Sequence, residues 1–400
     1  SGVRGREPSS GSRPLTASPW LWSPPTVLSG PAGPFYGGDS RSGDMTMTTD
    51  GKLIAVWTEP CLGTPFLYYS VHTKAGWSKP KFFFGGQEPD LAVAPDGTVY
   101  LVYTAQQDGR HDVYCVKWTG EGWDLMPPVS ATSGTSSQPA AAVKRDGTLL
   151  VIWTDTTEGH TRIYNAWLTQ TMTNTVWNTF FIGGTSYGSA PDIGVGPGDR
   201  VWVVWQQPEN QMSGDYDVYA LYGDGMSSWN DFAFNISDPG TGGTGGLEST
   251  LPRLVSSPRL GSFIAWQEDD GAHADIYYAD NVSDAQRYYF GLPENVSRTK
   301  TRSEAPALAV NGSGQAYLAW DEGDYFLFRS CLGPGAKWSA PTALVKGGNG
   351  DDMTDVALLA PSPVRVHALW SQTKAASPLD HDIYYRRGTL SQPYTVSLPL

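Results

Sequence analysis

The sequence has 400 residues, 12% of them aromatic, with 46 glycines, 30 prolines and a formal net charge of −13. This acidity, without any Lys/Arg-rich stripe, argues against a nucleic-acid partner and against adsorption to anionic lipid. No run of eighteen apolar residues is present, so we expect no membrane insertion. Sustained helical periodicity is missing, and many short apolar runs alternate with glycine and proline turns, which predicts an all-β protein.

The chain begins with an apolar-free segment, SGVRGREPSSGSRPLTAS, and we expect residues 1–18 to form a flexible tail. Residues 19–400 are predicted to form one domain, because a single pattern recurs along them. Each copy has a small apolar strand, a turn, an apolar strand ending in an aromatic residue, a loop, an Asp-x-Tyr strand and a Trp-x-x-Pro segment. The copies cover about residues 44–86, 89–130, 139–184, 190–237, 251–297, 305–348 and 355–398.

The aromatic residue that ends the second strand marks the register of the repeat. Successive markers are about fifty residues apart. Seven such units predict a seven-bladed β-propeller of four-stranded antiparallel blades, because seven copies close a ring without free sheet edges. The markers are Trp57, Tyr103, Trp153, Trp205, Trp266, Trp320 and Trp370.

Each strand of the repeat has residue types that suit its place in a blade. The first strands are rich in alanine and glycine, which fits the crowding at the axis of a propeller. The second strands are almost continuously apolar, as expected for burial on both faces. Large aromatic residues fill the widening gap toward the rim, so we interpret them as core. On the third strand they are Tyr68, Tyr114, Tyr164, Tyr219, Tyr277, Phe328 and Tyr384.

The two ends of the chain offer two ways of closing the ring. Residues 20–29 (WLWSPPTVLS) match the Trp-Ser-x-Pro segments of later fourth strands, so they can complete the last blade. Residues 392–398 (QPYTVSL) are an alternative fourth strand from the other end. We predict the first arrangement, in which an amino-terminal strand latches the ring.

The repeat, with its P-x-[ILA]-A-V, D-[IV]-Y-Y and W-S-x-P segments, resembles the repeats of sialidase-like and BNR-type propellers. The resemblance covers about residues 44–398 and implies a propeller fold in an extracellular, glycan-related setting. Sialidases carry an arginine triad, a Tyr/Glu nucleophile pair, an Asp acid and Ser-x-Asp-x-Gly-x-x-Trp boxes, and their propeller normally has six blades. No such box is present here, and Arg41 is the only arginine near the expected place of a triad member. The catalytic signature is therefore not carried over.

The long loops of the repeat are expected on one face of the ring. Loops between strands two and three, and between strand four and the next blade, share a face in propellers. The hairpins of the opposite face are mostly tight, so the long-loop face is the predicted binding face. The long loops cover residues 206–216, 237–251, 297–305, 346–354 and 371–381.

Polar residues recur on this face two positions after the marker, with Ala105 as the exception. They form either a ring that binds a cation or sugar hydroxyls, or a set of hydrogen bonds that serves the repeat itself. The ring consists of Glu59, Asp155, Gln207, Glu268, Glu322 and Gln372. Its four carboxylates are candidate ligand-binding residues.

Three further residues of the same face are candidates for ligand binding. His111 and His381 lie just before the third-strand Asp position of repeats two and seven, where a histidine is either a general base or a solvent-facing side chain. Arg41 lies just before the first strand. The sequence requires no cofactor; Asp351 and Asp352 in GGNGDDM offer oxygen ligands for Ca²⁺, although the segment is short for a calcium loop and a solvated turn is the favoured interpretation.

Four N-x-S sequons are candidate glycosylation sites, which favours a secreted or cell-surface protein. Two of them occupy equivalent places in successive repeats, so repetition of the blade also explains them. The sequons begin at Asn235, Asn281, Asn295 and Asn311.

The repeat is intact, whereas no Gly-x-Ser-x-Gly elbow, HExxH, phosphate loop or dinucleotide fingerprint is present. We therefore predict a non-catalytic extracellular propeller that binds a glycan or a protein partner, or forms part of a surface assembly, through its long-loop face. The alternative is a glycan-active enzyme, a hydrolase or a lyase, that uses carboxylates, arginine or histidine of that face. A glycosidase needs two carboxylates about 5–10 Å apart, which sequence spacing does not reveal.

Overall fold

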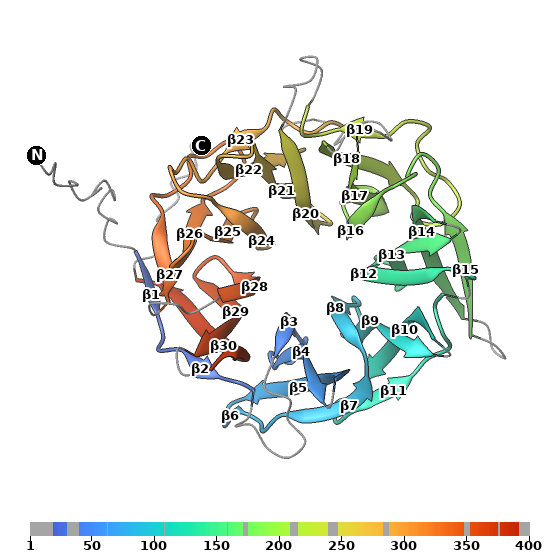
Figure 1. The fold of residues 1–400 in the computed structure, drawn as a ribbon, viewed down its shortest axis with the longest axis horizontal. Coiled ribbons are helices and arrows are strands. Elements are labelled where there is room, and N and C mark those ends of the chain that lie inside the picture. The colour runs from blue at the N-terminus through green and yellow to red at the C-terminus, as the bar shows by residue number, and fades with distance from the viewer. Residues whose placement is uncertain are drawn as a thin grey trace, which may run out of the picture.

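The computed structural model shows seven antiparallel sheets arranged as blades around a central axis (Figure 1). The predicted all-β, seven-bladed propeller is confirmed. One turn of 3-10 helix, η1 (Pro197–Asp199), is the only helix in the described residues, and no helix there has the length and apolarity to cross a membrane. The structure describes residues 19–29, 40–61, 63–107, 109–130, 132–157, 159–170, 175–208, 215–238, 247–282, 288–347, 353–374 and 377–391. The tail predicted over residues 1–18 lies outside them.

Each blade has its first strand nearest the axis and its fourth at the rim (Figure 1). The first strands are β3 (Arg41–Met47), β8 (Gln87–Val93), β12 (Thr135–Val143), β16 (Ser189–Val195), β20 (Glu248–Ser257), β24 (Glu304–Val310) and β28 (Met353–Ser362). The second strands are β4 (Leu53–Cys61), β9 (Val99–Gln107), β13 (Leu149–Thr157), β17 (Val201–Pro208), β21 (Gly261–Asp269), β25 (Ala316–Asp321) and β29 (Arg365–Lys374). The third strands are β5 (Thr64–Thr73), β10 (Arg110–Trp118), β14 (His160–Gln170), β18 (Tyr216–Gly223), β22 (Ala274–Asp280), β26 (Tyr325–Cys331) and β30 (Ser377–Leu390). The rim strands are β6 (Gly76–Trp77) with β7 (Lys81–Gly85), β11 (Trp123–Leu125), β15 (Thr175–Phe181), β19 (Phe234–Asn235), β23 (Glu294–Asn295), β27 (Thr342–Lys346) and, in blade 7, β1 (Trp20–Trp22) with β2 (Thr26–Val27).

The amino-terminal strand closes the ring, as predicted. β1 pairs antiparallel with β30, with Trp20 opposite Leu390, and β2 pairs with the same strand further along. The alternative closing segment, residues 392–398, lies outside the described residues. Since β1 and β2 occupy the outer edge of β30, the last blade is built from both ends of the chain.

The hydrophobic core lies between the blades. Seven clusters of buried side chains each join two neighbouring blades, one cluster at every interface of the ring. The seven marker residues are at most 3% exposed. Six of them stack on the aromatic residue opposite, with ring centroids 5.6–6.4 Å apart. The repeated aromatic residues are thus packing residues, as the sequence predicts.

In blade 6 the third-strand aromatic residue does not lie opposite the marker. Trp320 lies opposite Leu327, the residue before Phe328. The connection between β25 and β26 is short here, and a shift of one residue in a strand moves a side chain to the other face of the sheet. Phe328 therefore packs away from the marker, stacked on Tyr317 and edge-on against Trp20 of the latch.

A β-bulge interrupts the first strand of every blade. At each bulge one non-glycine residue has a positive φ of 49–55°. In five blades a side chain of the preceding blade accepts a hydrogen bond from the amide of that residue, at 2.8–3.2 Å. The strained backbone is thus held by contacts between blades. The seven residues are Ser42, Glu88, Gln138, Ala190, Leu251, Ala305 and Asp355.

Candidate functional site

The polar ring of the long-loop face holds the marker tryptophans in place. In five blades the side chain two positions after the marker accepts a hydrogen bond from the indole N–H of that tryptophan, at 2.5–3.4 Å. The same carboxylates accept a serine hydroxyl from the segment that enters the blade: Ser40 binds Glu59, Ser249 binds Glu268 and Ser303 binds Glu322. A buried indole N–H needs such an acceptor, which explains why the position is polar.

Two blades depart from this arrangement, and only the first departure follows from the same requirement. Tyr103 has no indole N–H, and its blade carries Ala105 at the ring position. Asp155 has a shorter side chain; it accepts the hydroxyls of Thr132, Ser136 and Thr157 instead. Among the described residues the Trp153 indole N–H has no hydrogen-bond partner.

Glu59, Asp155, Glu268 and Glu322 were predicted to bind a ligand. Their observed contacts are with hydroxyl groups and, except for Asp155, with the indole N–H of their own marker, so the structure gives them a role in the fold. Three of the four are buried, and Glu322 is partly exposed. Ligand binding by these carboxylates stays a prediction.

The surroundings of Glu268 alter its pKa. Burial raises its pKa to about 6, against the hydrogen bonds from Trp266 and Ser249, and the nearby carboxylates of Asp217 and Asp238 raise it further. Burial likewise raises the pKa of Asp217. A raised pKa in a carboxylate pair is typical of a general acid, so this is the place where acid–base chemistry would be sought first.

The contacts of Asp217 show that this pair also serves the blade. Asp217 accepts hydrogen bonds from the Asn235 amide and the Ser237 hydroxyl, at 2.9 and 3.1 Å. Blade 5 repeats the arrangement with Asp275, Asn295 and Ser297. Repetition at equivalent positions indicates a structural motif that ties the rim strand to the third strand.

The same motif confirms that the latch belongs to blade 7. Ser29, which follows β2, donates to Asp382 and accepts the amide of Ile383, at 2.9 and 3.0 Å. In blade 2, Ser130 and Asp112 make the corresponding contacts. The amino-terminal segment therefore supplies the serine that a continuous blade takes from its own fourth strand.

Two predicted site residues meet at the seam between blades 1 and 7. The Arg41 guanidinium donates to Nδ1 of His381 across 3.3 Å. Because arginine only donates, Nδ1 must be the acceptor, which places the proton of a neutral His381 on Nε2. His381 is buried, whereas Arg41 is exposed.

Ser40 joins this pair to the ring. Its hydroxyl donates to Glu59, its amide donates to the carbonyl oxygen of His381, and its carbonyl oxygen accepts the Ser371 hydroxyl at 2.5 Å. Arg41, Glu59 and His381, predicted separately, therefore lie around one residue. His111 lies on β10 of blade 2, opposite Gln106, and is not part of this cluster.

Three aspartates and one arginine occupy equivalent positions on the first strands. Asp44, Asp90 and Asp192 each accept an amide from the first strand of the next blade, at 2.7–2.8 Å. Burial raises the pKa of all three, that of Asp192 to about 6, while the positive charge of Arg253 opposes this. Composition alone did not single out these residues; the Pro-Asp pairs at Asp90 and Asp192 were the available signal, and Asp44 follows a glycine.

No metal site is found in the described residues: they contain no group of three or more His, Cys, Asp or Glu side chains that could hold an ion. The predicted calcium ligands Asp351 and Asp352 lie outside them, so Ca²⁺ binding stays a prediction.

Two of the four candidate glycosylation sites are buried in the folded protein. Asn281 and Asn311 are 0% and 2% exposed, and a glycan on a buried amide has no path to solvent. Asn281 accepts the Ser262 amide, and Asn311 donates to Gln315 and Tyr317. Asn235 and Asn295 are partly exposed, and a glycosylated amide keeps one N–H for its aspartate, so glycosylation there stays a prediction.

We expect that protein secreted by a glycosylating host carries no glycan at Asn281 or Asn311. A glycan attached at either position would place many polar groups in the hydrophobic core, so glycosylated chains would not fold. Peptide mapping by mass spectrometry of the folded fraction tests this, and occupancy at either asparagine in native protein would contradict it.

A scan against protein-family models and a search of curated proteins found no match. Solved structures match over most of the chain. A protein of unknown function from Dyadobacter fermentans superposes with a TM-score of 0.57 at 10% identity, over 94% of this chain and 100% of that chain. An α-L-arabinofuranosidase from Fusarium graminearum in complex with an iminosugar inhibitor gives 0.53 at 13%, over 92% and 98%. A polysaccharide lyase, an ulvan lyase bound to a GlcA–Rha3S saccharide, gives 0.56 at 10%, over 89% and 94%.

The resemblance to sialidase-like propellers is confirmed for the fold. Identities of 10–13% show the fold alone. The iminosugar inhibitor and the GlcA–Rha3S saccharide are ligands of those two proteins, and a shared fold does not transfer them to this chain.

Proposed function

We propose that this protein is an extracellular propeller, secreted or held at a cell surface, that binds a glycan on its long-loop face without cleaving it. The observation that carries the proposal is that the ring carboxylates and Arg41 make different kinds of contact on that face. The carboxylates of the ring accept hydrogen bonds from tryptophan and hydroxyl groups of their own blades, and the exposed residue Arg41 donates to His381 at the seam.

The chemistry of the seam suits a hydroxylated ligand. Arg41 offers several N–H donors in a fixed planar arrangement, and such a fork binds vicinal oxygens or a carboxylate. The likeness in fold to proteins that act on arabinofuranosides and on ulvan supports a glycan over a protein partner. Binding of a protein partner, or assembly at a surface, is the less favoured form of the same proposal.

The alternative is a glycan-active enzyme, and Glu268 with Asp217 is the pair that favours it. Both have raised pKa values. Their hydrogen bonds, however, recur in other blades: Glu322 repeats those of Glu268, and Asp275 repeats those of Asp217. A catalytic pair would differ from its copies, since only one blade would need it.

Glycan-array screening followed by calorimetry tests the proposal. We expect Arg41→Gln to weaken binding of the glycan identified in the screen by about 10-fold, because the substitution removes a charge-assisted hydrogen bond. Arg259→Gln, which changes an exposed arginine in a hairpin of the opposite face, is the matched control and should bind normally. Failure to bind any glycan, or equal binding by both variants, would refute this site.

A further inference from the structure

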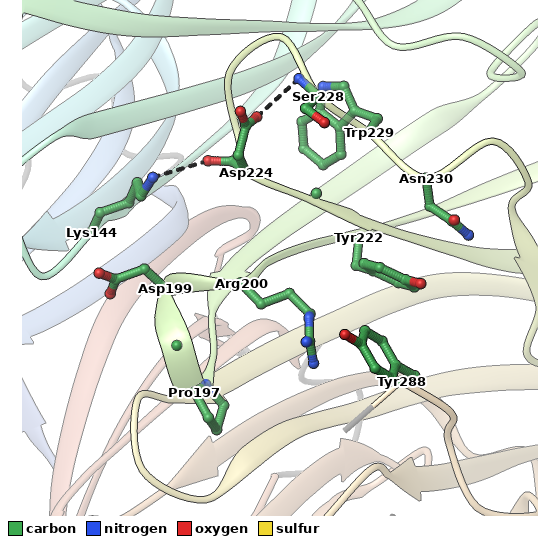
Figure 2. A pocket seen from close by; sticks show the side chains of 12 residues that line it. Lys144, Pro197, Asp199, Arg200, Tyr222, Asp224, Ser228, Trp229, Asn230 and Tyr288 are labelled. Atoms are coloured by element: carbon green, nitrogen blue, oxygen red, sulfur yellow. Dashed lines mark hydrogen bonds between the residues drawn. The ribbon is translucent and has the colours of Figure 1, made fainter. Parts of the chain in front are cut away.

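The face opposite the long loops carries a pocket of about 480 Å³ between blades 3, 4 and 5 (Figure 2). Blade 3 contributes Lys144 from its first hairpin. Blade 4 contributes η1, Arg200 and the hairpin after β18, and blade 5 contributes Tyr288. The pocket has the size of a small-molecule site, and the sequence analysis missed it because it assigned this face to tight turns.

Lys144 is a buried cation on the wall of this pocket. It is 8% exposed, and its ammonium group donates to the carbonyl oxygen of Asp224 at 3.2 Å. Among the described residues no carboxylate forms an ion pair with it. An ammonium group has three donors, so Lys144 brings one positive charge and hydrogen-bonding capacity to a pocket that also holds Arg200, Asp199 and Asp224.

The two acidic residues of the pocket do not neutralise this charge directly. The Asp224 carboxylate accepts the amides of Met226 and Ser228 in its own turn, at 2.7 and 3.0 Å. The Asp199 carboxylate accepts the amide of Arg145 at 3.3 Å. Both carboxylates therefore stabilise hairpins.

Arg200 and two tyrosines form the other side of the pocket. The Arg200 guanidinium lies over the Tyr288 ring at 3.9 Å and over the Tyr222 ring at 5.5 Å, and the ring centroids are 5.2 Å apart. Figure 2 shows Arg200 between Lys144 and these rings. Tyr289, next to Tyr288, is 64% exposed. The guanidinium covers the Tyr288 face, so a ligand meets this stacked pair beside the Lys144 ammonium group, which suits a ligand with one apolar ring face and one anionic group.

We propose that this pocket binds an acidic sugar, with its carboxylate or sulfate group at Lys144 and its ring against the Arg200 guanidinium that stacks on Tyr288. Charge-assisted hydrogen bonds would fix the anionic group, and ring contacts would orient the sugar. This site lies on the other face from the seam, so it is independent of the function proposed above.

Three trisaccharides test the proposal by calorimetry on the full chain: trigalacturonate, its methyl ester and maltotriose. A sulfated trisaccharide in parallel distinguishes a sulfate from a carboxylate ligand. We expect the anionic sugars to bind at least about 10-fold more tightly than the ester and the neutral sugar, with affinity falling as salt rises.

Two variants assign the binding to the pocket. Lys144→Gln and Arg200→Gln should each weaken binding of the acidic sugar by about 10-fold. Lys117→Gln removes an exposed lysine of the same face in blade 2, and Arg41→Gln alters the seam; both should bind normally. Because Lys144 is buried, Arg200→Gln keeps the test valid if the first variant unfolds.

Equal binding of the ester and the acid, absence of binding at 10 mM (about −2.7 kcal/mol), or normal binding by Arg200→Gln would each overturn the proposal. Loss of binding on Arg41→Gln alone would place the acidic sugar at the seam and would also refute this pocket.

Discussion

Trp20→Ala is expected to lower the free energy of unfolding by about 3–5 kcal/mol. Trp20 is 5% exposed and meets Tyr317 and Phe328 edge-on, with ring centroids 5.6 and 5.7 Å away. It belongs to a strand of three residues that covers the edge of β30, so its loss both empties the core between blades 6 and 7 and loosens the closure of the ring. Urea denaturation followed by tryptophan fluorescence and circular dichroism measures the change.

Leu21→Ala is the matched control for the latch. Leu21 lies on the same strand but is 63% exposed, so truncation should cost less than about 1 kcal/mol. If both variants had the same urea unfolding midpoint as the wild type, β1 would not be a structural part of blade 7.

Glu268→Ala is expected to cost about 2–4 kcal/mol, because it leaves the Trp266 indole N–H and the Ser249 hydroxyl without their acceptor in the core. Glu268→Gln keeps an acceptor and should fold, as blades 4 and 7 do with Gln207 and Gln372 at this position. The comparison separates the need for an acceptor from the need for a charge.

The free energy of unfolding of the wild type should change with pH in a defined direction relative to that of Glu268→Gln. Burial raises the pKa of Glu268 from 4.5 to about 6, so the folded state holds the proton more tightly than the unfolded chain. The resulting stability is present below pH 4.5 and is lost as pH rises through 6. Since glutamine does not titrate, the wild type should lose about 2 kcal/mol relative to Glu268→Gln between pH 4 and pH 7.

Thermal and urea unfolding at several pH values measures this difference. Glu121→Gln, at an exposed glutamate, should show no such change with pH. A constant difference between wild type and Glu268→Gln over this range would show that Glu268 is not held in a buried site.

Blade number, strand order and ring closure were predictable because they rest on periodicity. The markers recur with the period of the blade, and residues 20–29 match the fourth strands elsewhere. The hydrogen bonds between polar ring residues and their marker tryptophans could also have been predicted from the sequence. Side chains two positions apart in a strand share a face, so Glu59 had to lie beside Trp57, and Ala105 follows the one marker that lacks an indole N–H.

Features that depend on more than one blade were not predictable. The left-handed residue of each bulge has no common residue type, because the amide contacts of the preceding blade hold it. Arg41 and His381 are 340 positions apart and meet only when the ring closes. The pocket around Arg200 likewise draws its wall from three blades.

The polar residues of the long-loop face build the blades, and we propose that this face binds a glycan without cleaving it. The glycan that binds most tightly should be incubated with the protein and its mass followed over days. We predict that the saccharide stays intact while Arg41→Gln weakens its binding by about 10-fold. Shorter or unsaturated products that disappear in Glu268→Gln would contradict the claim and would make the protein an enzyme.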